Sequence, residues 1–316
     1  MLLSKWKDSV MQLEEACVTL PSEKSQAARE AGKKQPKWIH FGGGNLFRAL
    51  HAQIAQDLID AGDLDSGVVV CELLSDYILK NAFQPFNYDA LQVIMMPDGT
   101  LKERILSSAA TGIWSHPESP DWQQAVAYFE SPELQFVSFS VTEKAYGVVE
   151  EQILEGPGKT TNSMGIVASL LLARFKAGAA PIAMLSTDNF SQNGRIFREA
   201  ICQIAKIWEG ASLVGSDFVE WISDESKVSF PWSMIDRIVP NPSFEVAKKL
   251  KKQGWEDMQI TENPRGADTA GFANTEETWY LVVEDSFPNG RPPLEKAGVI
   301  LGSRETADKA DTMKVT

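Results

Sequence analysis

The chain has 316 residues, of which 43% are hydrophobic and 23% charged, a composition that is ordinary for a globular protein of about two domains. The formal net charge of −13 argues against nucleic acid and anionic membrane surfaces as partners, because their phosphates attract basic faces. No apolar run reaches the roughly 18 residues that a membrane helix needs. The three cysteines are scattered without a pairing pattern, which favours a reducing, cytoplasmic location.

Residues 1–36 are expected to form an arm made of an amphipathic helix and a polar connector. Trp6, Val10 and Leu13 share one face at helical spacing. This apolar face predicts that the arm packs on the surface of the following domain or on a partner subunit.

A glycine turn follows the first predicted strand. Residues 38–41 are an apolar run that suits a buried strand of a parallel sheet, and residues 42–44, all glycine, separate it from apolar residues at helical spacing. Strand, glycine turn and helix in this order are typical of a dinucleotide-binding unit, in which the backbone approaches a pyrophosphate and the helix N-terminus faces the anion. A plain glycine-rich turn is the alternative. The predicted cofactor contacts here are Phe41, Gly42, Gly43, Gly44, Asn45, Leu46, Phe47 and Arg48.

The start of this helix departs from the common G-x-G-x-x-G pattern. Phe47 stands where the third glycine is expected, and that glycine normally permits close packing of helix on strand. We therefore expect the helix to sit further from the strand or to tilt. Arg48, one turn into the helix, is expected to reach back to a phosphate.

A second strand is predicted at residues 68–71, and Glu72 stands at its end. In the dinucleotide fold an acidic residue at this place accepts hydrogen bonds from the adenosine ribose and repels a 2′-phosphate. A solvated carboxylate at a strand end is the alternative.

Residues 91–113 are then expected to form two strands joined by a turn at residues 97–100, a hairpin inserted into the nucleotide-binding fold.

Two further strands, at residues 136–141 and 181–185, are each followed by a polar stretch. The carboxyl ends of parallel strands line the ligand crevice, so these stretches are candidate site segments, with capping loops as the alternative. Thr142 is a predicted cofactor contact in the first stretch. Asn189, in the second, carries the donor and the acceptor that are needed to bind a hydroxyl.

Asp236 and Arg237 lie within the apolar stretch FPWSMIDRIVP. Charges in such a setting are costly unless they are paired or used, so these two residues are predicted to be functional or to form structural ion pairs. A strand is expected at residues 278–283, a rigid turn at 285–294 and a helix at 305–314.

Four stretches, FGGGNLFRA, STDNFSQNGR, FPWSMIDRIVP and VEDSFPNGRPPLEKAGV, together resemble the polyol-specific long-chain dehydrogenases, the family of mannitol 2-dehydrogenase, fructuronate reductase and tagaturonate reductase. The resemblance implies a Rossmann-like α/β fold with a doubly wound, mainly parallel sheet and a β-hairpin insertion. It implies an NAD-binding domain at residues 37–295 after the arm of residues 1–36. Residues 296–316 would begin a mostly helical substrate domain, most of which the chain lacks.

The resemblance also implies roles for three residues. Lys314 matches the family's catalytic lysine, which exchanges a proton with the substrate hydroxyl while hydride passes to or from the nicotinamide. Asn189 matches an asparagine that contacts the reacting oxygen, and Asp236 matches an aspartate at the substrate hydroxyls. No metal is expected, because the reaction in this family needs none and the three histidines lack ligand spacing with the cysteines.

The function implied is an NAD-dependent oxidoreductase of a keto sugar acid, such as the conversion of D-fructuronate to D-mannonate. Mannitol 2-dehydrogenase is the near alternative. A dinucleotide-binding fragment without catalysis and a methyltransferase are alternatives of other classes. The expected partner is a small sugar or sugar acid, and the oligomeric state is left open.

Overall fold

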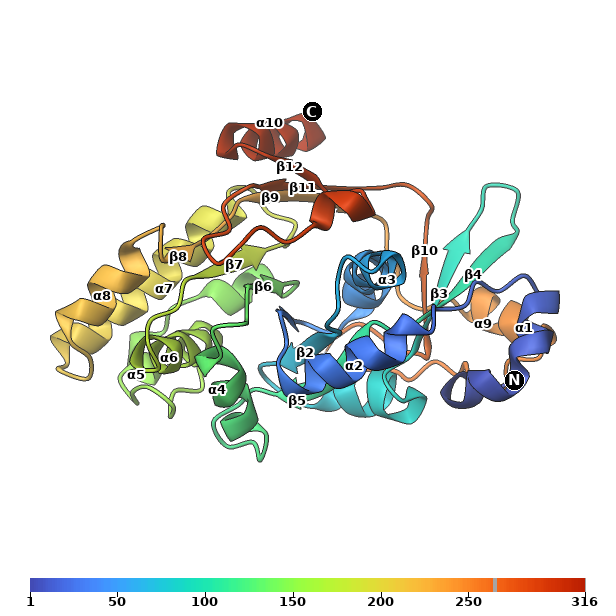
Figure 1. Ribbon diagram of the computed structural model, residues 1–316, viewed down its shortest axis with the longest axis horizontal. Coiled ribbons are helices and arrows are strands. Elements are labelled where there is room, and N and C mark those ends of the chain that lie inside the picture. The colour runs from blue at the N-terminus through green and yellow to red at the C-terminus, as the bar shows by residue number, and fades with distance from the viewer. Residues whose placement is uncertain (264–265, 316) are drawn as a thin grey trace.

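The computed structural model describes residues 1–263 and 266–315 of the protein, with side chains placed through Met313 (Figure 1). At its centre is a six-stranded sheet in which every neighbouring pair of strands is parallel. The order β5-β2-β1-β6-β7-β8 means that the chain starts in the middle and winds outward to both edges. This confirms the predicted doubly wound α/β sheet. The strands are β1 (Trp38–Phe41), β2 (Val68–Glu72), β5 (Ala109–Trp114), β6 (Phe136–Phe139), β7 (Ile182–Ser186) and β8 (Val228–Ser229).

Two helical layers cover the sheet, and alternate strand residues face each of them. Ile39 and Phe41 of β1 pack in one hydrophobic core, and Trp38 packs in the other. The first layer holds α4 (Trp122–Glu130), α5 (Glu150–Ile153), α6 (Ser163–Lys176), α7 (Asn193–Gly210), α8 (Ser216–Ser223) and η5 (Glu143–Tyr146). The second holds η2 (Phe47–His51), α3 (Ala52–Ala61), η3 (Leu79–Phe83) and η6 (Leu294–Ala297). Within the described part of the chain, no helix has both the length and the apolar character to cross a bilayer.

The predicted hairpin is present, but the segment contains three strands instead of two. β3 (Ala90–Met95) and β4 (Leu101–Leu106) pair antiparallel. The chain then leaves the hairpin at Ser107 and Ser108, whose polar groups bond to the second helical layer, and β5 joins the central sheet beside β2. β10 (Phe272–Thr275) completes the hairpin sheet by pairing parallel to β3.

A third, small sheet lies at the end of the central sheet (Figure 1). Its order is β12-β11-β9, formed by β9 (Ser233–Arg237), β11 (Trp279–Glu284) and β12 (Ile300–Gly302). The last helix, α10 (Arg304–Val315), packs on β9 and β11. The expected strand near residue 278 and the expected C-terminal helix are both present.

The N-terminal arm differs from the expected single helix and polar connector. It consists of η1 (Leu3–Ser9), α1 (Val10–Glu15) and a third helix, α2 (Lys24–Lys34). Leu3 and Leu13 pack with the hairpin sheet and with α9 (Phe244–Lys252) in a core of their own. Helix α2 packs through small residues: a Cβ on Gly32 would lie 2.3 Å from the carbonyl oxygen of Gly67. A face of small residues lacks the apolar pattern that predicts a helix, which explains why this segment was expected to be a connector.

Arg174, near the end of α6, is a fully buried cation that is held by carbonyl groups. Burial lowers its pKa to about 10. Each of its five N–H groups meets a carbonyl oxygen at 2.7 to 3.0 Å. The guanidinium thus ties the end of α6 to the segments that enter β6 and β7. The acceptors belong to Phe129, Ser131, Leu134, Ala180 and Pro181.

Arg174→Lys should therefore lower the free energy of unfolding by about 2–4 kcal/mol, because lysine has three donors and no planar fork, so buried carbonyls lose their partners. Urea unfolding would measure this loss. The matched control is Arg195→Lys, at an exposed arginine that pairs with Glu199, for which the change should stay within about 0.5 kcal/mol. Equal losses in the two variants would contradict the structural role of Arg174.

Candidate functional site

The glycine turn lies at the carboxyl end of β1, packed between the exits of two neighbouring strands. Gly42 has a φ of +99°, which favours glycine, and a Cβ there would lie 2.2 Å from the carbonyl oxygen of Ser140. A Cβ on Gly43 would lie 2.8 Å from the side chains of Phe83 and Val70. By contrast, a Cβ on Gly44 would meet no atom within 4 Å. The first two glycines are thus required by packing, and the third borders open space that a ligand can enter.

The helix after the turn opens with a wide π-helical stretch, Phe47–His51, before it continues as α3. Phe47 takes the position of the missing third glycine and is fully buried. Its ring lies 4.8 Å from that of His40 and 6.0 Å from that of Phe83. The large ring thus fills the space between helix and sheet where a glycine normally permits close contact. Single π-helical turns of this kind are frequent at functional sites.

Arg48 has partners other than the expected phosphate. The residue is fully buried, and its guanidinium donates to Asn45 Oδ1 at 2.6 Å and to the carbonyl oxygen of Ala270. Asn45 in turn donates to the carbonyl of Asp268 at 3.1 Å. Because these carbonyls belong to the segment that enters β10, Arg48 and Asn45 fasten the start of the helix to the hairpin sheet. The burial lowers the pKa of Arg48 to about 10.

Glu72, at the end of β2, contacts the glycine turn directly. Its Oε1 accepts the backbone N–H of Gly43 at 2.6 Å. Burial raises the pKa of Glu72 to about 7, although the hydrogen bond from Gly43 acts in the opposite direction. The carboxyl group is therefore not the solvated strand end that was the alternative; it lies beside the glycine turn.

A buried carboxyl group joins the exits of β6 and β7. Asp188 accepts the backbone N–H of Val141 at 2.6 Å, the hydroxyl of Ser186 at 3.1 Å and the hydroxyl of Tyr146. Burial raises its pKa to about 7. Thr142 follows Val141, and Asn189 follows Asp188, so this contact brings together the two loops that carry those candidates. Asp188 lies in a polar stretch that was predicted as a site segment, but nothing in its local sequence indicated that it is buried.

A second connection joins the β7 exit to β9. Asn193 is fully buried and donates to the carbonyl of Asp188 at 3.0 Å and to the carbonyl of Ser233 at 3.0 Å. Its Oδ1 accepts the backbone N–H of Ser233 at 3.1 Å. Gly194 permits the approach, because a Cβ there would lie 2.5 Å from the carbonyl oxygen of Phe230. The stretches that contain Asn189 and Asp236 are therefore neighbours in space.

Asp236 and Arg237 occupy different environments on β9. Asp236 is exposed and lies opposite Tyr280 of β11. Arg237 is partly buried and donates through Nε to Thr275 Oγ1 at 2.7 Å. Its two terminal nitrogens are buried without a hydrogen-bond partner among the described residues, and burial lowers its pKa to about 10. The ion pair that was one expectation for Arg237 is absent among residues 1–263 and 266–315.

The remaining two candidates lie near the third sheet. Asn189 is exposed at the β7 exit. Lys314 lies within α10, but its side chain is outside the described part of the structure. The start of α10 is fixed by Arg304, which donates to Glu284 at 3.1 Å and to Glu225 at 2.9 Å and whose guanidinium lies 5.7 Å from the ring centroid of Trp232. These contacts attach α10 to the end of β11.

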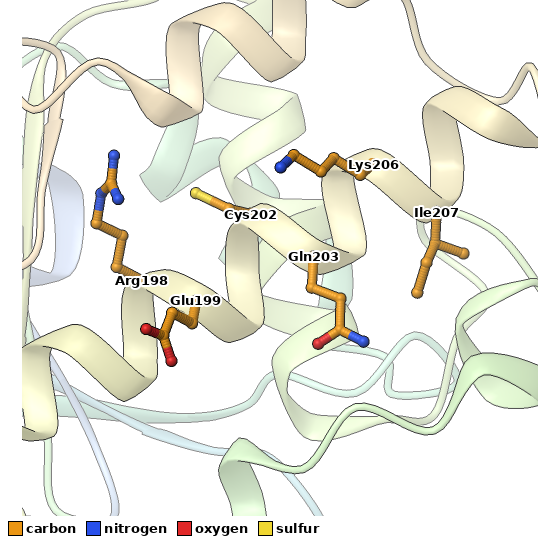
Figure 2. A pocket seen from close by; sticks show the side chains of 6 residues that line it. All are labelled: Arg198, Glu199, Cys202, Gln203, Lys206 and Ile207. Carbon is orange, nitrogen blue, oxygen red and sulfur yellow. The ribbon is translucent and has the colours of Figure 1, made fainter.

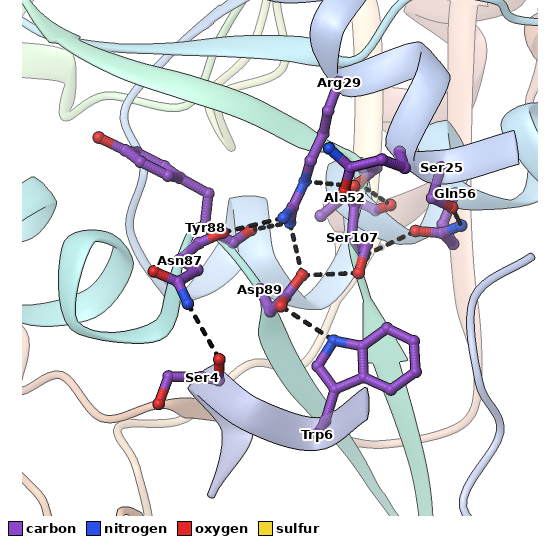
Figure 3. Close-up of polar contacts among 12 residues, drawn as sticks. Ser4, Trp6, Ser25, Arg29, Ala52, Gln56, Asn87, Tyr88, Asp89 and Ser107 are labelled. Carbon is purple, nitrogen blue, oxygen red and sulfur yellow. Dashed lines mark hydrogen bonds and ion pairs between the residues drawn. The ribbon is translucent and has the colours of Figure 1, made fainter. Parts of the chain in front are cut away.

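Two surface hollows lie away from this edge of the sheet. One is open and lies along the outer face of α7, where Arg198, Cys202 and Lys206 project side by side (Figure 2). The other lies beneath the N-terminal arm, where Asp89 accepts from Arg29 at 2.5 Å and from Trp6 at 3.0 Å (Figure 3). Ser107 also donates to Asp89, at 2.6 Å. The polar groups drawn in this second hollow satisfy one another, so the cluster is a structural tie between arm and hairpin.

Known proteins resemble the chain over most of its length. The sequence profile of the mannitol dehydrogenase Rossmann domain matches residues 36–296. The D-mannonate oxidoreductase of Thermotoga maritima is 43% identical in an alignment of 296 residues that covers 90% of this chain and 54% of that protein. The polyol:NADP oxidoreductase of Gluconobacter oxydans is 29% identical, over 91% of this chain and 58% of that protein.

Two solved structures are similar as well. The mannitol 2-dehydrogenase of Pseudomonas fluorescens, in a ternary complex with NAD and D-mannitol, superposes with a TM-score of 0.79 at 25% identity, covering 100% of this chain and 60% of its own. A D-sorbitol dehydrogenase in substrate-free form gives a TM-score of 0.76 at 27% identity, over 95% of this chain and 59% of its own. The chain thus spans a little more than half the length of these relatives.

Glu72→Gln provides a test of the buried carboxyl group that needs no ligand. The pKa of Glu72 is higher in the folded than in the unfolded protein, so its contribution to stability is present at low pH and is lost as the pH rises through about 7. Between about pH 5 and pH 8, the wild type should lose about 1–2 kcal/mol of unfolding free energy relative to Glu72→Gln. This loss is smaller than the full pKa shift of Glu72 implies, because the residue keeps some solvent contact. Urea unfolding at the two pH values measures this; parallel curves for the two proteins would contradict it.

Proposed function

The chain belongs to the mannitol dehydrogenase family, and on this premise we propose that it is the dinucleotide-binding part of a polyol or hexuronate dehydrogenase. The reaction proposed is hydride transfer between NAD and a keto sugar acid of the D-fructuronate and D-mannonate type. The observation that carries the proposal is the glycine turn at the carboxyl end of β1, with Glu72 bonded to Gly43 beside open space at Gly44. The identity of 43% to a D-mannonate oxidoreductase supports the substrate class.

The cofactor proposed is NAD, held by residues 41–47, Glu72 and Thr142, while Arg48 fastens the start of the helix to the segment that enters β10. The open backbone at Gly44 and the N-terminal turn of the helix fit a pyrophosphate. The Glu72 carboxyl group fits the adenosine ribose, where it would accept hydroxyl hydrogens and repel a 2′-phosphate. Bound NAD would accept or deliver the hydride.

Lys314, Asn189 and Asp236 are proposed to act on the substrate. Lys314 would take the hydroxyl proton in oxidation and return it in reduction, a role for which burial beside a cationic nicotinamide lowers the pKa of a lysine toward neutrality. The amide of Asn189 would donate to the reacting oxygen as negative charge develops on it. Asp236 would accept hydrogen bonds from the substrate hydroxyls. The link from Asn193 to Ser233 supports the grouping of Asn189 with Asp236.

We also propose the domain limits 1–36, 37–295 and 296–316 and a cytoplasmic location.

The near alternative for the reaction is the interconversion of D-fructose and D-mannitol. The similarity to a mannitol 2-dehydrogenase bound to NAD and D-mannitol favours this alternative. An assay with fructose, fructuronate and tagaturonate, each with NADH and NADPH, separates the substrate classes. If the wild type binds NADH but consumes none of the three, the chain acts only as a dinucleotide-binding unit.

Lys314→Ala, made in a protein of the full length of its relatives, should lower kcat by about 10²–10⁴-fold, because the proton acceptor is removed. NADH affinity should change little. Stopped-flow absorbance and NADH fluorescence measure the two quantities. Lys309→Ala is the matched control on the same helix, since Lys309 is exposed and pairs with Glu305. Retained turnover in Lys314→Ala would refute the assignment of the base.

Glu72→Ser should shift cofactor preference toward NADP. Removal of the carboxylate removes its repulsion of a 2′-phosphate and its bonds to the ribose, so the ratio of kcat/KM with NADPH to that with NADH should rise by about tenfold or more, equivalent to roughly 1.4 kcal/mol. Glu277→Ser, at an exposed residue paired with Lys102, is the control. An unchanged ratio would count against the ribose role.

A further inference from the structure

The peptide unit between Gly42 and Gly43 is held at both of its ends. The hydroxyl of Ser140 donates to the carbonyl oxygen of Gly42 at 3.1 Å, and the N–H of Gly43 donates to Glu72 at 2.6 Å. In a trans peptide the C=O and N–H bonds point in opposite directions, so fixing one end fixes the other. Ser140 on the β6 side thus determines where the Gly43 N–H points on the β2 side.

This peptide needs such a clamp because both of its residues are glycines. Without side chains, rotation of the plane between them meets little steric resistance. A rotated plane would turn the Gly42 carbonyl toward the Glu72 carboxylate and would remove the donor that now holds that carboxylate. The hydrogen bond from Ser140 opposes this rotation.

His40 holds Ser140 in place, and the hydrogen bonds define its tautomer. Ser140 uses its one hydroxyl hydrogen on Gly42, so Ser140 must accept from His40 Nε2 at 2.8 Å. His40 Nδ1 then accepts from the hydroxyl of Ser138 at 2.6 Å. Ser138 in turn accepts from Trp38 Nε1, which can only donate, at 2.7 Å. In this series of four hydrogen bonds, from Trp38 to Gly42, each donor is used once.

The ring of His40 also stays neutral, as this pattern requires. The residue is fully buried, and its ring lies 4.4 Å from the ring of His51. Burial, with the second ring as a smaller contribution, lowers the pKa of His40 well below its usual value, although an interaction with the backbone of Gly42 acts in the opposite direction. At neutral pH the ring is therefore in the neutral form, with one nitrogen donating and the other accepting, as the hydrogen bonds to Ser140 and Ser138 require.

We propose that His40 and Ser140 are positioning residues of the dinucleotide site: they fix the Gly42–Gly43 peptide so that its N–H holds the Glu72 carboxyl group in place for the ribose. This inference rests on the proposed function for its ligand. The clamp itself is a property of the free protein and is measured without a cofactor.

The first experiment compares Ser140→Ala with Ser169→Ala. Ser169 also donates its hydroxyl to a glycine carbonyl, that of Gly165 at 2.8 Å, but within α6. Ser140→Ala should weaken NADH binding by about tenfold, the effect of one lost hydrogen bond, and should speed hydrogen exchange of the Gly43 amide. Ser169→Ala should do neither. NADH fluorescence titration and amide exchange measured by NMR report the two quantities.

The second experiment compares two replacements of His40. The amide nitrogen of glutamine reaches the position of Nε2 and can still donate to Ser140, whereas asparagine reaches only the position of Nδ1. His40→Gln should keep NADH affinity within about threefold of wild type, and His40→Asn should match Ser140→Ala, with no further loss when the two are combined. Thermal unfolding of both His40 variants reports any general loss of stability.

The outcomes separate the two ideas. If Gly43 exchange is unchanged in Ser140→Ala, or if the glutamine and asparagine variants bind NADH equally, the clamp is wrong. If the wild type binds no NADH while Gly43 exchange responds to Ser140→Ala as expected, the clamp holds and the proposed function fails.

Discussion

The close contact between the glycine turn and the exits of the neighbouring strands is the constraint on which the site depends. Gly42 lies against the backbone of Ser140, and Gly43 lies against Val70 and Phe83, so neither position has room for a side chain. Because the turn is packed on both sides, its free backbone is confined to Gly44 and the start of the helix. The same packing places the end of β2, with Glu72, within hydrogen-bond distance of the turn.

Hydrogen bonds between buried polar groups extend this order along the edge of the sheet. Asp188 joins the exits of β6 and β7, and Asn193 joins β7 to Ser233 of β9. Glu284, at the end of β11, accepts the backbone N–H of Trp232, which precedes β9. Arg304 then joins Glu284 to α10. Asp188, Asn193 and Glu284, the buried groups in this series, are each satisfied by a partner from another element, as buried polar groups must be. The segments that carry the proposed cofactor and substrate contacts are therefore positioned by the fold and not by the ligand.

Continuous apolar runs and glycine punctuation were sufficient to predict much of the architecture. The strands β1, β2, β6 and β7, the glycine turn and the hairpin follow from local sequence, whereas the doubly wound, mainly parallel sheet followed from the resemblance of four stretches to a known family. Helix α2 was missed because its contact face is made of small residues, Ser25, Ala28 and Gly32. β5 was predicted as part of the hairpin because nothing in its local sequence distinguishes it from a hairpin strand. Only its pairing with β2, which is distant in the sequence, places it in the central sheet. The partners of Arg48 were not predictable because Ala270 lies far away in the sequence, and the role of Asp188 was missed because a carboxylate in a polar loop carries no local signature of burial.

The pairing of β3 with β10 has a consequence for how the protein is made. Leu91 pairs with Phe272, and the same core includes Leu3 of the arm and Leu250 of α9. During synthesis on a ribosome, the arm and the hairpin emerge long before the segments that cover them, so their apolar faces stay uncovered while most of the central sheet is translated. Contacts of such large sequence separation form slowly, and exposed hairpin edges at this stage invite aggregation. We therefore expect the yield of folded protein to depend on chaperones that protect this part of the nascent chain.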